Sequence, residues 1–173
     1  IVADAPSAAR VLYDYYGGKD KLLNVSDELM EAVDKADSAQ FSMDEIINSK
    51  DWDLLSFIMD ARTGLGRFRE FRVSNYELML NLIDYCHSHT IDEIMQLKDV
   101  KERVDLYNSY SEEFKEQLNR CTTIYDNLIV LDLRDEDVIY PGNRFMIYAL
   151  NPDINISIHV IRGFKNQNTV FAA

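Results

Sequence analysis

The sequence is poor in cysteine and has no long apolar run. Cys86 and Cys121 are the only cysteines among its 173 residues, too few for a disulfide framework or a four-thiolate zinc site. No apolar stretch approaches the roughly 20 residues that a membrane span needs, and no signal peptide is visible. We therefore expect a soluble protein of the reducing cytoplasm that has no membrane partner.

Positive charge is also scarce. Lys and Arg total 18 against 30 Asp and Glu, which gives a net charge of −12. Such a surface on average repels nucleic acid and anionic membranes, so any anion-binding site has to be local. The hydrophobic content of 47% is ordinary for a packed globular protein and allows one ample domain or two small ones.

The first half of the sequence predicts one short helix after another. A serine or an aspartate stands at most of the expected starts, where its side chain can accept a hydrogen bond from the first turn. The first helix is expected to turn Val11, Leu12 and Tyr15 inward. The expected helices cover residues 7–16, 26–36, 42–48, 51–61 and 74–89, with Ser26, Ser42, Asp51 and Ser74 as caps.

Residues 100–121 carry a more regular pattern. Seven side chains recur there at alternating steps of four and three, a spacing that predicts one long helix with an apolar seam. Such a helix could pack on a neighbouring domain or bridge two domains. The seam consists of Val100, Val104, Tyr107, Ser111, Phe114, Leu118 and Cys121.

The last third of the sequence predicts a sheet. Strands are expected at residues 127–133, 154–161 and 169–173, and a buried helix at 143–150. We therefore predict an α/β protein that is helical to about residue 95 and continues as a helix-plus-sheet unit. The chain opens on Ile1 instead of Met and stops inside a predicted strand, so we expect it to be part of a longer protein.

Asp34 and Asp37 stand near the C-terminal end of the second predicted helix. Leu29, Val33 and Asp37 are four residues apart, so Asp37 is expected on the stripe that faces the core. Two negative charges are unfavourable at this end of the helix dipole, and a divalent cation such as Mg²⁺ or Mn²⁺ would offset them. Compensation by Lys35 and solvent is the alternative that the spacing leaves open.

The segment of residues 60–72 is basic within this acidic chain. Its arginines are Arg62, Arg67, Arg69 and Arg72. The planar fork of arginine suits phosphate, and glycines such as Gly64 and Gly66 let backbone N–H groups approach an anion. Arg62 and Arg67 are therefore the candidate phosphate contacts. Pairing of these arginines with acids elsewhere in the chain is the alternative.

Four segments, taken in order, resemble one known family. They read APSAARVLYDYYGG, DELMEAVDKADSAQFS, LLSFIMDARTGLGRFREFRVSNYELM and LIVLDLRDEDVIYPGNRFMIYALNPDINISIHV. The order of these segments and the local sequence within each resemble the DHH phosphoesterases, in particular the exopolyphosphatase-related and oligoribonuclease-like members. The resemblance runs along nearly the whole chain.

The resemblance implies a catalytic domain that holds two Mn²⁺ or Mg²⁺ ions, followed by a DHH-associated domain. Residues 1–95 would be the helix-rich C-terminal part of the DHH domain. Residues 96–173 would be a linker helix and an incomplete α/β substrate-binding domain. Asp37 matches the fourth acidic motif of the family and becomes an expected metal ligand, with Asp34 as its neighbour. The Asp-x-Asp, Asp-His-His and glycine-rich motifs of the family are absent from the sequence.

By this resemblance the whole protein would be a manganese-dependent phosphohydrolase, and the isolated chain would be inactive. The bond cleaved would be a phosphodiester or a phosphoanhydride, in a short oligonucleotide, a cyclic dinucleotide, single-stranded nucleic acid or polyphosphate. Substrate contacts are expected from Arg62, Arg67, Arg162 and Lys165, with the polar run 166–168 beside them. A homodimer is left open.

A function of another class is also open. The apolar seam of residues 100–121 would dock a partner, and the chain would be a non-catalytic acidic helical interaction module.

Overall fold

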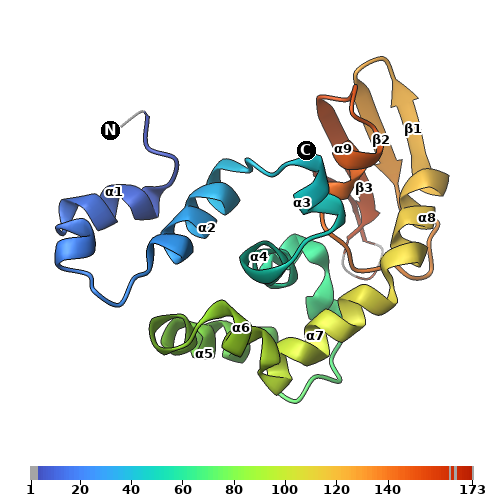
Figure 1. The fold of residues 1–173 in the computed structure, drawn as a ribbon. Coiled ribbons are helices and arrows are strands. Elements are labelled where there is room, and N and C mark those ends of the chain that lie inside the picture. Colours follow the sequence, from blue (N-terminus) through green and yellow to red (C-terminus); the bar gives the residue numbers. More distant parts are fainter. Residues whose placement is uncertain (1–3, 164, 166, 173) are drawn as a thin grey trace.

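The computed structural model describes residues 4–163, 165 and 167–172. Helices fill the first two thirds of the chain and a four-stranded sheet lies at the other side of the molecule from α1 and α2 (Figure 1). The helices are α1 (Ala8–Tyr15), α2 (Asp27–Ser38), α3 (Met43–Ile47), α4 (Asp51–Met59), α5 (Asn75–Ser88), α6 (Ile91–Gln96), α7 (Lys98–Ser109), α8 (Ser111–Cys121) and α9 (Met146–Leu150). The strands are β1 (Thr122–Tyr125), β2 (Leu128–Asp132), β3 (Ile156–Arg162) and β4 (Thr169–Ala172). The predicted α/β class is confirmed.

Serine caps begin several helices where the sequence predicts them. The hydroxyls of Ser26, Ser42 and Ser74 each accept a hydrogen bond from a backbone N–H three residues on. Such a bond satisfies a donor that the first turn leaves free. The expected cap at Asp51 is wrong, because α4 begins at Asp51 and Lys50 holds the cap position. A carboxylate in the first turn still complements the helix dipole.

Helix α1 buries a different face from the one predicted. Tyr13 is its buried residue, whereas Leu12 and Tyr15 are 59% and 80% exposed. The helix packs mainly against α2, so only a narrow stripe of it is covered. The 3₁₀ turn η1 (Gly18–Asp20) then leads towards α2.

The predicted long helix over residues 100–121 is broken into α7 and α8 at Tyr110. The ring of Tyr110 packs between those of Phe68 and Tyr140, with centroids 5.7 and 5.4 Å away. The seam residues Val100 and Leu118 are 0% and 4% exposed, each inside a core of this same chain. The seam is therefore covered internally, and the expectation that it docks a partner is wrong.

The interior contains two hydrophobic cores. The first joins α4, α5, α6 and α7 around residues such as Ile58, Leu78 and Ile94. The second joins α8, α9 and the sheet, and Ile46 of α3 enters it from the helical half. Helix α7 thus packs with the helices that precede it, while α8 packs on the sheet. The division into domains at residues 95 and 96 remains a prediction.

The sheet has the order β1-β2-β3-β4. β1 pairs with β2 and β3 with β4 in antiparallel fashion, while β2 and β3 are parallel and are connected through α9. A parallel pair needs such a crossover. Strands β2 and β3 and the helix α9 confirm the predictions, and β4 does so up to Ala172, because Ala173 lies outside the described residues. β1 was not predicted. Within the described residues, no helix is long and apolar enough to cross a bilayer.

Candidate functional site

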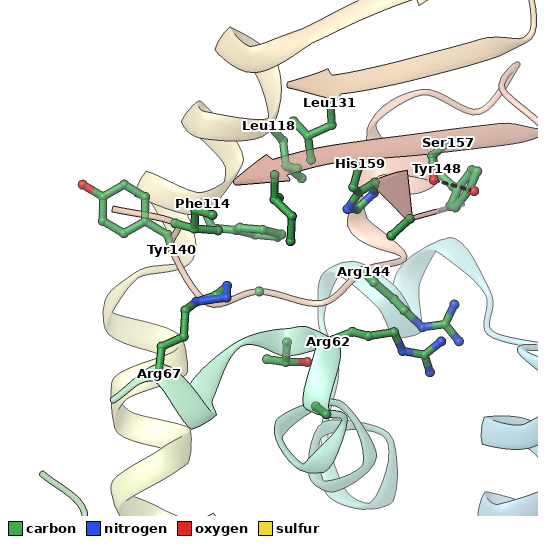
Figure 2. Close-up of a pocket in the computed structure, with 16 residues that line it drawn as sticks. Arg62, Arg67, Phe114, Leu118, Leu131, Tyr140, Arg144, Tyr148, Ser157 and His159 are labelled. Atoms are coloured by element: carbon green, nitrogen blue, oxygen red, sulfur yellow. Dashed lines mark hydrogen bonds between the residues drawn. The ribbon is translucent and has the colours of Figure 1, made fainter. Parts of the chain in front are cut away.

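A cavity of about 340 Å³ lies between the basic segment and the sheet (Figure 2). The 3₁₀ turns η2 (Ala61–Thr63) and η3 (Leu65–Arg67) form one wall, directly after α4. Helix α8 and the strands β2 and β3 form the opposite wall, where Leu131 pairs with His159. A hydrogen bond from the N–H of Gly142 to the carbonyl of Thr63, 3.0 Å long, joins the loop before α9 to the first wall.

One end of the cavity is cationic. Arg62 and Arg144 lie side by side there, with both guanidinium groups pointing the same way (Figure 2). Asp60 holds them: its carboxylate accepts from Nε and Nη2 of Arg62 at 2.9 and 2.8 Å and from Nε of Arg144 at 3.3 Å. Burial on its own would raise the pKa of Asp60, but the hydrogen bonds from Arg62 outweigh it and the pKa lies below its usual value. One carboxylate thus orients two arginines.

The other end of the cavity is aromatic. Arg67 points into it below the rings of Phe114 and Tyr140 (Figure 2). Two glycines make room for these side chains: a Cβ on Gly64 would lie 2.3 Å from Nη2 of Arg67, and one on Gly142 would lie 2.1 Å from the Phe114 ring. Gly64 also has a φ of 89°, which favours glycine. The backbone therefore approaches both side chains closely.

Polar groups of the sheet lie between these two ends. The hydroxyl of Tyr148 on α9 lies 2.8 Å from the Oγ of Ser157 on β3, and His159 follows on the same face of that strand. Burial lowers the pKa of His159, so its ring is neutral near pH 7 and offers one donor and one acceptor. The cavity thus combines fixed cations, aromatic rings and neutral hydrogen-bonding groups, a set suited to a nucleotide.

The chain is similar to a known phosphodiesterase. Among solved structures it matches the pGpG-specific phosphodiesterase PggH from Vibrio cholerae with 58% identity and a TM-score of 0.84. The match covers 97% of this chain and 56% of the PggH chain, so the chain spans a little over half the length of that protein. No family model and no curated protein matches the chain.

Asp34, a predicted metal ligand, is held by protein groups instead. Its carboxylate accepts from Nε and Nη2 of Arg10 at 2.9 and 2.6 Å and from the hydroxyl of Ser7 at 2.6 Å. Burial would raise the pKa of Asp34, but the bonds from Arg10 and Ser7 outweigh it and the pKa is lowered. A cation would have to displace Arg10, so the negative end of α2 is already compensated on this side.

Asp37, the other predicted ligand, is exposed, so the expectation that it faces the core is wrong. The stripe that turns inward on α2 is the one that begins at Met30, which is 5% exposed, and it leads to Asp34. Lys35 does not compensate Asp37 either, because its Nζ binds Glu45 and Asp53 at 2.7 and 3.1 Å. Asp37 makes no hydrogen bond or ion pair with the part of the chain that the structure describes.

The described residues do not form a metal site on their own. In residues 4–163, 165 and 167–172, no three His, Cys, Asp or Glu side chains lie close enough together to hold a metal ion. Asp37 alone offers one carboxylate, whereas Mg²⁺ and similar cations need several converging oxygens. At the C-terminal end of α2, the described residues therefore offer such a cation a single free carboxylate, that of Asp37.

Of the predicted substrate contacts, Arg62 and Arg67 line the cavity, whereas Arg162 and Lys165 are not among its lining residues. Arg162 donates from Nε to the carbonyl of Arg134 at 3.1 Å, and its Nη2 lies 3.5 Å from Asp135. Of the polar run at 166–168, Asn166 lies outside the described residues. The guanidinium of Arg162 is therefore held by these two groups at the end of the sheet.

The sequence analysis missed Arg144 and His159. Arg144 lies within the helix predicted at 143–150 and His159 within the strand predicted at 154–161, and neither range predicts a ligand-binding side chain. His159 lies opposite Leu131 of β2, so it faces the same side of the sheet as that buried residue, a register that the sequence alone does not give.

Proposed function

We propose that the whole protein hydrolyses the phosphodiester bond of a short linear dinucleotide such as pGpG, and that this chain supplies the substrate cavity. The observation that carries the proposal is the joint presence of arginines and aromatic rings in one cavity, in a chain 58% identical to a pGpG-specific phosphodiesterase. Membership of the DHH family, with residues 1–95 and 96–173 in its two domains, is part of the same proposal.

Phosphate would bind at the cationic end. Arg144 engages Asp60 through Nε alone and lies over the ring of Phe145 at 4.0 Å, so its two terminal nitrogens remain for an anion. Arg62 is 64% exposed and also keeps donors beyond those that reach Asp60. Forked guanidinium groups bind phosphate oxygens in pairs. Two arginines pre-oriented by one carboxylate would hold the phosphate without first having to order their side chains.

Asp37 is the residue of this chain that we propose as a ligand of Mn²⁺ or Mg²⁺ in the whole protein. Its carboxylate is exposed, whereas that of Asp34 is occupied by Arg10. When bound, such a cation activates water and stabilises the leaving oxygen. The contribution of this chain is one carboxylate and the orientation of the substrate phosphate by Arg62 and Arg144.

The first experiment measures substrate preference. The purified whole protein is incubated with Mn²⁺ and either pGpG, bis(p-nitrophenyl) phosphate or polyphosphate, and GMP, nitrophenol or phosphate release is followed. We expect pGpG to be cleaved to GMP with the highest kcat/KM. The proposal fails if pGpG stays intact or if polyphosphate is the preferred substrate.

The second experiment compares Asp37→Asn with Asp34→Asn, two acids one turn apart on α2. Residues that merely support a metal ligand cost about 10- to 100-fold when replaced, so Asp37→Asn should lower Mn²⁺-dependent hydrolysis by more than about 100-fold while leaving the free energy of unfolding within about 0.5 kcal/mol. Asp34→Asn should lose about 2 kcal/mol of stability with its bonds from Arg10, and it should keep hydrolysis where it is folded. Unchanged hydrolysis in Asp37→Asn would refute the ligand role.

A further inference from the structure

We propose that the aromatic end of the cavity binds a guanine base and that Arg67 recognises the edge of that base. This makes Arg67 a specificity-determining residue instead of the phosphate contact that the basic segment suggested. The assignment rests on the proposed function, because it takes a guanine dinucleotide as the substrate class. Three features of the cavity support it: the free donors of Arg67, the rings beside it and its separation from the two other arginines.

Arg67 has donors and no acceptor. Within residues 4–163, 165 and 167–172, no group accepts a hydrogen bond from its guanidinium or forms an ion pair with it. The chain holds 30 acidic residues against 18 basic ones, so acids to pair with it are plentiful in the sequence. Arg67 is an exposed residue that lines the cavity, so its guanidinium donors are accessible to a ligand. A ligand that brings two acceptors can accept from two of these donors at once.

The rings beside Arg67 offer flat apolar surfaces. Phe114 comes from α8 and Tyr140 from the loop before α9, and both line the cavity. Tyr140 is itself supported by Tyr110, whose centroid lies 5.4 Å away. Bases stack on such rings, and every base has a face that can do so. The rings therefore provide affinity for a base, but they do not distinguish one purine from another.

Arg67 distinguishes guanine from adenine. Guanine carries two acceptors, O6 and N7, on one edge, and they match the two parallel donors of a guanidinium. Adenine carries N7 beside the N6 amino group, so one donor of Arg67 would meet another donor. A lysine in place of Arg67 would keep the charge but lose the paired geometry.

The two ends of the cavity divide the nucleotide between them. Arg62 and Arg144 point away from Arg67 and its rings (Figure 2), so one nucleotide can place its phosphate on the first pair and its base beside Arg67. A volume of about 340 Å³ lies at the lower end of the range of about 300–1,000 Å³ for small-molecule sites. The cavity is thus sized for one nucleotide of the substrate.

Calorimetric titration of this chain with 5′-GMP, 5′-AMP and guanosine tests the assignment. We expect GMP to bind about 5- to 150-fold more tightly than AMP, the range that one bidentate contact gives. Arg67→Lys and Arg67→Met should both bring this ratio close to one, and both should weaken guanosine as much as GMP. Arg62→Met should weaken GMP and leave guanosine unchanged. Arg69→Met is the matched control, because Arg69 belongs to the same segment but does not line the cavity.

Equal affinity of the unaltered chain for GMP and AMP would overturn the base assignment. So would an Arg67→Met variant that weakens GMP and AMP alike and spares guanosine, because Arg67 would then contact phosphate. Hydrolysis of pGpG by the whole protein separates the two proposals. Cleavage of pGpG without any preference for GMP would leave the proposed function standing and remove the base site, and a preference for GMP without cleavage would do the reverse.

Discussion

Arg103 and Arg67 both lie beside aromatic rings, but Arg103 is buried and hydrogen-bonded whereas Arg67 is exposed and lines the cavity. Arg103 is 0% exposed in the first core. It donates to Oδ1 of Asn75 at 2.9 Å and to the carbonyl of Asp99 at 2.8 Å, and it lies over the ring of Phe71 at 4.2 Å. Arg67 has a comparable aromatic setting in the cavity, yet no acceptor within the described part of the chain.

The difference separates a structural cation from a functional one. A buried guanidinium with every donor paired ties segments together, because removing it strands its partners. A guanidinium held in a cavity with free donors stabilises little by itself and is available to a ligand. The same contrast divides the two acids of α2, since Asp34 is paired with Arg10 and Asp37 is exposed.

The largest effect on stability is expected for Arg103→Met. The change leaves Asn75 and the carbonyls of Val73 and Asp99 without their donor, so the free energy of unfolding should fall by about 3–5 kcal/mol. Urea denaturation measures it. Arg67→Met, as the matched variant, should change stability by less than about 1 kcal/mol. Equal losses in the two variants would remove the distinction between them.

The next effect is expected for Gly142→Ala. The new methyl group would lie 2.1 Å from the Phe114 ring, so the ring has to move, at a cost of about 1–3 kcal/mol. GMP should also bind more weakly, because the ring lines the cavity. Both quantities can be measured on one preparation by denaturation and calorimetry.

Gly66→Ala is the control for that change. A methyl group at Gly66 would meet only the side-chain nitrogen of Asn75, at an ordinary 3.7 Å. Stability and GMP affinity should both stay close to those of the unaltered chain. If Gly142→Ala behaved like Gly66→Ala, the close approach of backbone and ring would not define the cavity.

The smallest effect concerns paired acids at low pH. The Nζ of Lys35 and the N–H of Ser42 hold the pKa of Glu45 at about 2, below its ordinary value of 4.5. Because the folded pKa is the lower one, the stabilisation is full above pH 4.5 and is lost as the pH falls towards 2. The free energy of unfolding of the unaltered chain should therefore fall more steeply, as the pH drops through this window, than that of Glu45→Gln. Urea denaturation at a series of pH values gives the two curves. Parallel curves would show that the pair contributes nothing.

Local signals in the sequence predicted the elements well. Ser26, Ser42 and Ser74 cap helices because capping depends on a few neighbouring residues. Apolar and polar residues alternate over 154–161, and this pattern, which is also local, predicted β3. The break at Tyr110 was not predictable, because it depends on rings of Phe68 and Tyr140 that only the fold brings near.

The site was less predictable than the fold. The spacing of apolar residues on α2 allows two inward stripes, one that ends at Asp34 and one that ends at Asp37. Arg10 of α1 lies against Asp34, so α1 covers the first stripe, and the sequence of α2 alone does not contain that information. Arg62 and Arg67 of the basic segment both line the cavity, and their roles towards a ligand remain predictions. Their different environments arise from Asp60 on one side and Phe114 on the other, a contrast that sequence spacing does not contain.

A crystal structure of the chain with 5′-GMP tests the central claim most directly. We expect the phosphate between Arg62 and Arg144, and the guanine beside Phe114 with O6 and N7 facing the guanidinium of Arg67. A nucleotide bound in the reverse direction, with its phosphate on Arg67, or bound outside this cavity would contradict the account.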